Sequence, residues 1–151
     1  MHFLLHTATL TAFFASITIA NGNLNVRNAC SFNVYYKPAD SSSANSNPRT
    51  LKSGETYSEP QDLTSGREIK VTRDTSAGSP ILQLDYIVSG GRIFYDFSLV
   101  NGNPFSSNEF SLTPSDKTCP ASSCVRDKCQ GQNEGATASC NDATNLTLRL
   151  C

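Results

Sequence analysis

The stretch Gln83–Val100, QLDYIVSGGRIFYDFSLV, decides the fold. Two runs rich in aromatic and β-branched residues flank Gly90-Gly91, and a two-residue Gly-Gly loop suits a primed turn, in which the backbone needs positive φ angles. The stretch therefore predicts a β-hairpin whose apolar face lies in the core. Counting outward from the turn, that face carries the cross-strand pairs Val88–Ile93, Tyr86–Tyr95 and Leu84–Phe97.

The opposite face of this hairpin carries a pair of acids. In the same register, Asp85 lies directly across from Asp96. Like charges directly opposite each other destabilise a sheet, so one interpretation is that the pair has a function. The alternatives are a solvated outer face, or a longer loop, because a shift of one residue exchanges the faces of one strand.

Residues 1–20, MHFLLHTATLTAFFASITIA, contain no Asp, Glu, Lys or Arg. The small residues Thr18 and Ala20 suit signal-peptidase cleavage after Ala20. A transmembrane anchor is the alternative, although the apolar run is interrupted by Thr and Ser and is short for spanning. We therefore predict a signal peptide over 1–20 and one mature domain over 21–151, secreted and either freely extracellular or bound to a cell wall.

All six cysteines lie in the predicted mature part, at Cys30, Cys119, Cys124, Cys129, Cys140 and Cys151. An even number in a secreted chain predicts three disulfides, but their connectivity cannot be deduced from spacing. A zinc site at Cys124 and Cys129 is the alternative, disfavoured by the oxidising route and by the absence of histidine from the mature chain. Asn145-Leu146-Thr147 is a sequon for N-glycosylation, and Asn28-Ala29-Cys30 is a much poorer one.

The composition excludes several classes of function. A formal net charge of −1 argues against binding nucleic acid through a basic field. Both histidines lie in the predicted signal peptide, so Ser/His/Asp and Cys/His nucleophile systems are excluded. No motif for phosphate, a cofactor or a metal is present, and we expect neither cofactor nor metal. The even number of cysteines gives no reason to expect a disulfide-linked oligomer, and we expect a monomer.

Paired carboxylates are the remaining catalytic option. Asp85 and Asp96 are the candidates, and the chain offers further acids at Glu55, Glu59, Glu68 and Asp74. Directly opposed strand residues have Cβ atoms roughly 4.5–5.5 Å apart, which is nearer the separation of carboxyl groups in retaining glycosidases than in inverting ones. Carboxylates also accept hydrogen bonds from sugar hydroxyls without any catalysis.

The rest of the chain predicts about seven or eight short strands separated by turns, and no amphipathic helix of ordinary length. An all-β sandwich or barrel follows. We expect exposed loops over Pro38–Arg49 and Gln130–Ala138, either of which could carry recognition. The segment Cys124–Cys129 predicts one helical turn at most.

Several segments resemble one known family over nearly the whole mature chain. These are LNVRNACSFNVYY, LKSGETYSE, REIKVTRD, LDYIVSGGRIFYDFSLVNGNPF, CPASSCVRDKC and SCNDATNLTLRLC. The chain resembles thaumatin-like proteins, and most closely their short fungal branch, the yeast-phase-specific or antigenic thaumatin-like proteins. The resemblance implies a β-sandwich, stapled by disulfides, that lacks the large cysteine-rich subdomain. It also implies the disulfide pairs Cys30–Cys151, Cys119–Cys140 and Cys124–Cys129.

Large members of that family have an acidic cleft between the sandwich and the missing subdomain. Asp85 matches the glutamate of this cleft and Asp96 matches one of its aspartates. Ile93 stands where a further acid is usual, and the last acid belongs to the missing region. Arg73 is the candidate for a basic member. The resemblance therefore supports Asp85, Asp96 and Arg73 as binding residues, with one cleft wall absent.

Two classes of function follow. The first is a secreted, non-catalytic fungal protein that binds at the cell surface or at a host interface, as an antigen, effector or wall-associated protein, with cell-wall polysaccharide such as β-glucan or a host protein as partner. The second is a weak endo-β-1,3-glucanase or β-glucan-binding protein that uses Asp85 and Asp96. We expect neither nucleic acid nor membrane as a partner.

Overall fold

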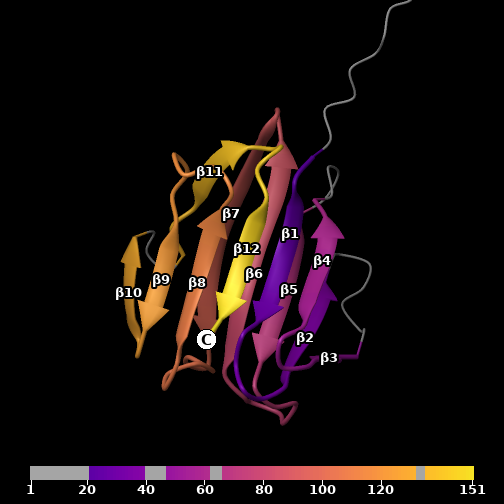
Figure 1. The fold of residues 1–151 in the computed structure, drawn as a ribbon, viewed down its shortest axis with the longest axis vertical. Helices are drawn as coiled ribbons and strands as arrows, with labels where there is room; N and C mark the ends of the chain where they lie inside the picture. Colours follow the sequence, from indigo (N-terminus) through magenta and orange to yellow (C-terminus); the bar gives the residue numbers. More distant parts are fainter. Residues whose placement is uncertain (1–20, 40–46, 62–65, 132–134) are drawn as a thin grey trace, which may run out of the picture.

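The computed structural model describes residues 21–39, 47–61, 66–131 and 135–151, and these form a sandwich of two six-stranded sheets (Figure 1). One sheet has the order β10-β9-β8-β12-β1-β4, and the other has the order β11-β7-β6-β5-β2-β3. The strands are β1 Asn23–Asn28, β2 Val34–Ala39, β3 Arg49–Leu51, β4 Thr56–Pro60, β5 Arg67–Thr72, β6 Ile81–Ser89, β7 Arg92–Val100, β8 Glu109–Pro114, β9 Ser122–Val125, β10 Lys128–Gly131, β11 Ala138–Asn141 and β12 Leu146–Leu150.

The β6–β7 hairpin has the register that the sequence predicts. Asp85 is paired with Asp96, and the three predicted apolar pairs face the core. Gly90 and Gly91 have φ angles of 60° and 73°, and a type I′ turn needs positive φ at both central positions. The hairpin is therefore fixed by its turn chemistry together with the burial of its apolar face.

The two ends of the domain lie side by side in the first sheet. Strand β1 pairs in parallel with β12, and the Cys30–Cys151 disulfide joins the ends of these strands across a sequence separation of 121 residues. Cys119–Cys140 and Cys124–Cys129 close much shorter loops, with separations of 21 and 5 residues. These are the pairs that the family resemblance implies, and they place all six cysteines in the sandwich.

The core lies between the two sheets and takes large apolar side chains from both. Phe97 of β7 and Phe110 of β8 meet edge to face, with ring centroids 5.5 Å apart. The ring centroid of Phe105 lies 6.5 Å from that of Phe110. Burial of a side chain of this size contributes about 1.5–3 kcal/mol. The core therefore holds the sheets together across their middle, which leaves their outer faces free for other roles.

The sequence underestimates the number of strands. The described residues contain twelve, because β3, β9, β10 and β11 are only three or four residues long and carry no extended alternation. The expected helical turn over Cys124–Cys129 is wrong: β9 and β10 form a hairpin there, with positive φ at Arg126 and Asp127.

Both expected loops are shorter than predicted. Pro38 and Ala39 belong to β2 and Arg49 to β3, while residues 40–46 lie outside the described residues. In the second loop, Gln130 and Ala138 belong to strands, and 132–134 lie outside the described residues. The predicted signal peptide over 1–20 also lies outside them.

Within the described ranges, no helix is long and apolar enough to cross a membrane.

Candidate functional site

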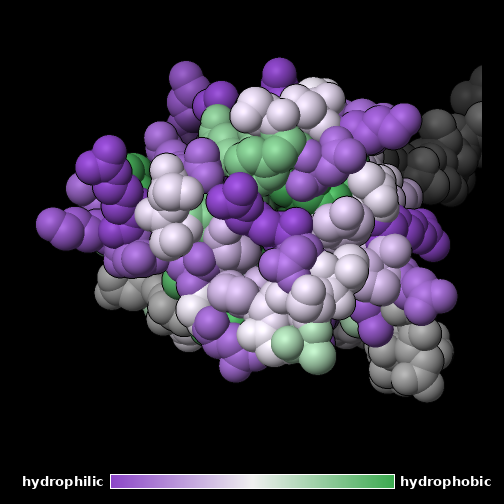
Figure 2. Space-filling model, turned by 90° about the horizontal axis from the view of Figure 1, so that it is seen from below, coloured by the Kyte–Doolittle hydropathy of each residue, from purple (hydrophilic) through white to green (hydrophobic). Residues whose placement is uncertain are grey.

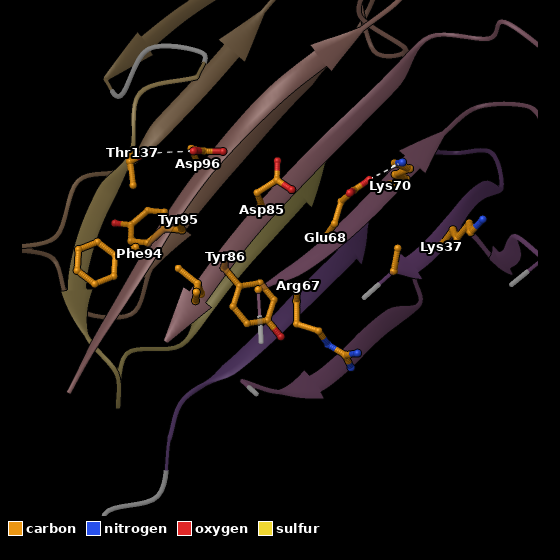
Figure 3. A pocket seen from close by; sticks show the side chains of 13 residues that line it. Lys37, Arg67, Glu68, Lys70, Asp85, Tyr86, Phe94, Tyr95, Asp96 and Thr137 are labelled. Atoms are coloured by element: carbon orange, nitrogen blue, oxygen red, sulfur yellow. Dashed lines mark hydrogen bonds and ion pairs between the residues drawn. The ribbon is translucent and has the colours of Figure 1, made fainter. Parts of the chain in front are cut away.

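Three acids form one row across the outer face of the second sheet. Glu68 of β5 is paired with Asp85 of β6, which is paired in turn with Asp96 of β7. Figure 3 shows these three side chains rising from neighbouring strands on the same face. Alternation in the strands places the acids outward because the residues that flank them, such as Leu84 and Tyr95, are buried in the core.

The row lies in an open groove of about 580 Å³ on this face. Ile87 and Phe94, a cross-strand pair, provide its apolar side, and Ile87 is 45% exposed. Lys37 and Lys70 provide its basic side. The groove therefore offers carboxylates, ammonium groups and an aromatic ring to one ligand. Its lining residues are Lys37, Ala39, Gly66, Arg67, Glu68, Lys70, Asp85, Tyr86, Ile87, Phe94, Tyr95, Asp96 and Thr137.

All three acids of the row are partly buried, and Asp85 lies at its centre. Its two carboxylate oxygens accept hydrogen bonds from the Gln83 side-chain nitrogen at 3.3 and 3.0 Å. Burial is the main cause that raises the pKa of the Asp85 carboxyl, and the charge of Asp96 adds to it, while Gln83 and Lys70 act in the opposite direction. The folded protein therefore stabilises the protonated form of Asp85.

The two facing aspartates have different partners. The Thr137 hydroxyl, just before β11, donates to Asp96 at 3.2 Å, whereas the Asp85 carboxylate is held by Gln83 on its own strand. Each acid is thus positioned by a separate neighbour. From the sequence, Thr137 could be placed only within the expected loop Gln130–Ala138, because β11 is too short to predict and its pairing with β7 is long-range.

Two lysines and Arg67 are the basic residues that line the groove. The Lys70 ammonium lies 2.5 Å from a Glu68 carboxylate oxygen, and Lys37 is directly across from Lys70 on β2. A smaller cavity of about 260 Å³ adjoins the groove and shares these two lysines. The strand register explains the clustering, since Glu68 and Lys70 alternate with the buried Ile69.

The structure does not bring Arg73 to the acidic pair. Arg73 follows the end of β5, five residues beyond Glu68, which corresponds to about 16 Å along an extended chain. Its guanidinium lies 4.1 Å from the centroid of the Phe32 ring, a cation–π contact. It is not among the residues that line the groove.

The sequence also offered Glu55, Glu59 and Asp74 as acids. None of the three lines the groove, and each has a structural role elsewhere. Glu59 is buried between the sheets, where it accepts hydrogen bonds from Tyr57 at 2.6 Å and Tyr86 at 3.0 Å and pairs with Arg67 at 3.3 Å. Burial, together with Glu59, raises the pKa of Tyr57 above its ordinary value.

Asp74 and Glu55 stabilise turns instead. Asp74 accepts hydrogen bonds from the backbone of Ser76 at 2.9 Å and from the Ser79 hydroxyl, which together lower its pKa. Glu55 accepts a hydrogen bond from the backbone of Lys52 at 2.8 Å. Neither residue lines the groove.

The two sequons occupy opposite environments. Asn145 is exposed just before β12, and its side-chain oxygen accepts a hydrogen bond from Asn23 at 2.7 Å. Asn28 is fully buried and its amide nitrogen donates to Phe32 and Leu51. Asn145 is therefore accessible to modification in the folded protein and Asn28 is not.

One group of potential metal ligands occurs among the described residues, formed by Asp116, Cys119 and Cys140. The two sulfur atoms are bonded to each other, so neither offers the thiolate that metal binding needs. Asp116 accepts hydrogen bonds from Thr118 instead, and these lower its pKa.

A sandwich of two sheets stapled by three disulfides is the architecture of a thaumatin-like protein, and comparison with solved structures confirms the class. The protein elicitor MoHrip2 from Magnaporthe oryzae superposes with a TM-score of 0.69 at 25% identity, covering 86% of this chain and 98% of that one. The thaumatin-like xylanase inhibitor TLXI superposes with a TM-score of 0.64 at 17% identity, covering 85% and 98%.

The family within this class is defined by sequence. The family model described as Bys1, Blastomyces yeast-phase-specific protein, matches residues 11–151, and the chain belongs to this family. The antigenic thaumatin-like protein of Arthroderma benhamiae is 36% identical over 147 residues, which covers 88% of this chain and 74% of that relative. The resemblance to the short fungal thaumatin-like proteins is thereby confirmed.

Proposed function

We propose that this protein is secreted and acts by binding, without catalysis, at the surface of the producing cell or at its interface with a host. The observation that carries the proposal is the acidic row Glu68–Asp85–Asp96 in an open groove on one sheet face. Three disulfides support an oxidising, extracytoplasmic location. The antigenic relative and the elicitor neighbour are of the same fold and fit such a role.

The groove is suited to a polysaccharide ligand. Carboxylates accept hydrogen bonds from sugar hydroxyls, the lysines donate them, and Phe94 and Ile87 offer an apolar surface to a sugar ring. Cell-wall β-glucan is the partner that we propose first, and a host protein is the alternative. The groove lies on the outer face of a single sheet (Figure 3), which favours reversible binding over the water-excluding enclosure that catalysis uses.

A weak endo-β-1,3-glucanase is the second candidate, and one observation favours it. Burial raises the pKa of the Asp85 carboxyl, as a general acid requires, while Asp96 faces it directly and could serve as nucleophile. The separate hydrogen-bond partners of the two acids weigh against it, because Gln83 and Thr137 hold them toward different neighbours.

A binding assay separates these functions. The purified mature protein is incubated with insoluble β-1,3-glucan, chitin and intact fungal wall, and the bound fraction and the released reducing ends are measured in the same tubes. We expect glucan binding without sugar release, and loss of that binding in the Asp85→Asn, Asp96→Asn double variant.

The matched control is Glu109→Gln with Asp142→Asn, which also removes two negative charges but none from the groove. Equal loss of binding in the control would refute the groove as the site. Sugar release that vanishes only in the Asp85→Asn, Asp96→Asn variant would replace the binding function by the glucanase.

A further inference from the structure

The outer face of the first sheet is a polar surface on the opposite side of the molecule from the acidic groove. Its outward side chains alternate with core residues and align across four strands, β4, β1, β12 and β8. Most of them carry a hydroxyl or an amide. The two central rows are Ser58, Asn25, Thr147 and Thr113, and then Thr56, Arg27, Arg149 and Ser111.

The second row contains two arginines side by side. Arg27 of β1 and Arg149 of β12 are register neighbours on adjacent parallel strands, which lie about 4.8 Å apart. Both are exposed. Like charges in this arrangement are unfavourable, and neither core packing nor a local ion pair explains them.

Neither arginine forms an ion pair with an Asp or Glu side chain of the described residues. Among the described residues, Arg27 has no carboxylate within 4.0 Å, and Arg149 makes one hydrogen bond of 3.4 Å, to the main-chain oxygen of Cys151. Glu55 beside Thr56 is directed to the backbone of Lys52. The nearest acid on the strands of this face is Glu109, which lies in the next row, two residues from Ser111.

We infer that this face binds a uronate-bearing polysaccharide through Arg27 and Arg149. A guanidinium presents a planar fork of N–H donors that matches a carboxylate with two parallel hydrogen bonds. The hydroxyls of Ser111 and Thr147 and the amide of Asn25 lie in the same two rows, where sugar hydroxyls can bond them. Two adjacent guanidinium groups complement a polymer with repeated carboxylates.

This site is separate from the proposed function. It uses the other sheet and the opposite charge, so a failure at one site leaves the other unaffected. Asn145 lies on the same face, four residues before Arg149 and about 13 Å along β12. A glycan on Asn145 would rise beside the arginines, and the assay therefore uses protein produced without N-glycans.

The test is affinity electrophoresis at low ionic strength through gels that contain polygalacturonate, β-1,3-glucan or dextran sulfate. We expect the wild type to be retarded by polygalacturonate, and Arg27→Gln or Arg149→Gln to weaken its Kd about fivefold each, as expected for exposed ion pairs. Retardation should fall as salt rises, because exposed charges are screened.

The matched control is Arg49→Gln, which removes the same charge from an exposed position on the other sheet. An equal loss in this control, or no retardation of the wild type by polygalacturonate, would overturn the inference. Equal or stronger retardation by dextran sulfate that also depends on Arg27 would overturn the uronate class.

Thermal unfolding without polysaccharide provides a second readout. We expect Arg27→Gln to melt at the same temperature as the wild type or slightly higher, because it removes a like-charge contact. A clear fall in melting temperature would assign the arginine pair a structural role and would contradict the inference.

Discussion

Asn28 is the residue whose removal we expect to destabilise the sandwich most for its size. It is fully buried at the end of β1. Its amide nitrogen donates to the carbonyl oxygens of Phe32 at 2.8 Å and Leu51 at 3.0 Å, and its side-chain oxygen accepts from the backbone N–H of Cys30 at 3.0 Å. One side chain thus connects β1, the turn that follows it and β3.

Truncation in Asn28→Ala would leave these three backbone groups without their partner. An orphaned buried donor or acceptor costs about 1–3 kcal/mol, and the bond to Phe32 is only partly buried. We therefore expect the free energy of unfolding to fall by about 3–5 kcal/mol in total, a large share of the roughly 5–15 kcal/mol that a domain has.

Urea unfolding with the disulfides intact measures this loss, and Asn25→Ala is the matched control. Asn25 lies on the same strand with its side chain on the outer face, and its one hydrogen bond, to Leu146, is 3.5 Å long. We expect the control to change stability by under about 0.5 kcal/mol. A loss below about 1 kcal/mol in Asn28→Ala would refute the reasoning, since it would mean that the freed backbone groups find other partners.

Three further predictions concern the disulfides, the acidic row and the buried Glu59. From loop length alone, replacing Cys30 and Cys151 by Ser should cost about 5 kcal/mol, and replacing Cys124 and Cys129 about 2 kcal/mol; similar losses in urea unfolding would contradict the loop-entropy account. The raised pKa of Asp85 means that the folded protein binds the carboxyl proton more tightly than the unfolded chain does. Ionisation of Asp85 therefore lowers the free energy of unfolding as the pH rises from about 3.9 through the folded-state pKa. Asp85→Asn should therefore raise the urea midpoint at pH 7 and leave it unchanged near pH 3; a lower midpoint at pH 7 would show that the Gln83 bonds outweigh burial. Glu59→Gln should cost about 1–3 kcal/mol, because a neutral amide replaces a buried carboxylate that accepts hydrogen bonds from Tyr57 and Tyr86 and pairs with Arg67, and an unchanged midpoint would contradict a stabilising role for that carboxylate.

The β6–β7 hairpin and the family could be read from the sequence, because local patterns determine both. Alternation, two adjacent glycines and the apolar face together fixed the register that set Asp85 against Asp96. The family was recognisable because short motifs recur in order along the chain. Local chemistry of this kind needs no knowledge of which strands become neighbours.

The remainder of the site depends on long-range pairing and could not be predicted in the same way. Thr137 reaches Asp96 only because β11 adds to the edge of β7, and Lys37 meets Lys70 only because β2 pairs with β5. Arg73 was predicted to lie beside the acidic pair, and it does not line the groove. Its distance from Glu68 follows from where β5 ends, and the sequence alone does not determine that end. Glu59 resembled the other acids in the sequence, since nothing local signals a polar cluster between two sheets.

The two outer faces of the sandwich differ in the sign of the charge that they concentrate. Asp85 and Asp96 are paired on one sheet, and Arg27 and Arg149 are neighbours on the other. All four side chains point away from the core, so a neutral residue at any of these positions would leave the core packing unchanged. The formal net charge of the chain is only −1, so the two like-charge pairs do not result from a large excess of either charge.

The end of the sandwich shown in Figure 2 has a different character, with hydrophilic side chains over most of its surface and hydrophobic ones in separate patches. The core holds both like-charge pairs in register before a ligand arrives. At the arginine pair, a ligand carboxylate would also relieve the repulsion that is present in the free protein. Binding at either face should then raise the melting temperature of the wild type more than that of a variant in which one member of that pair is neutral.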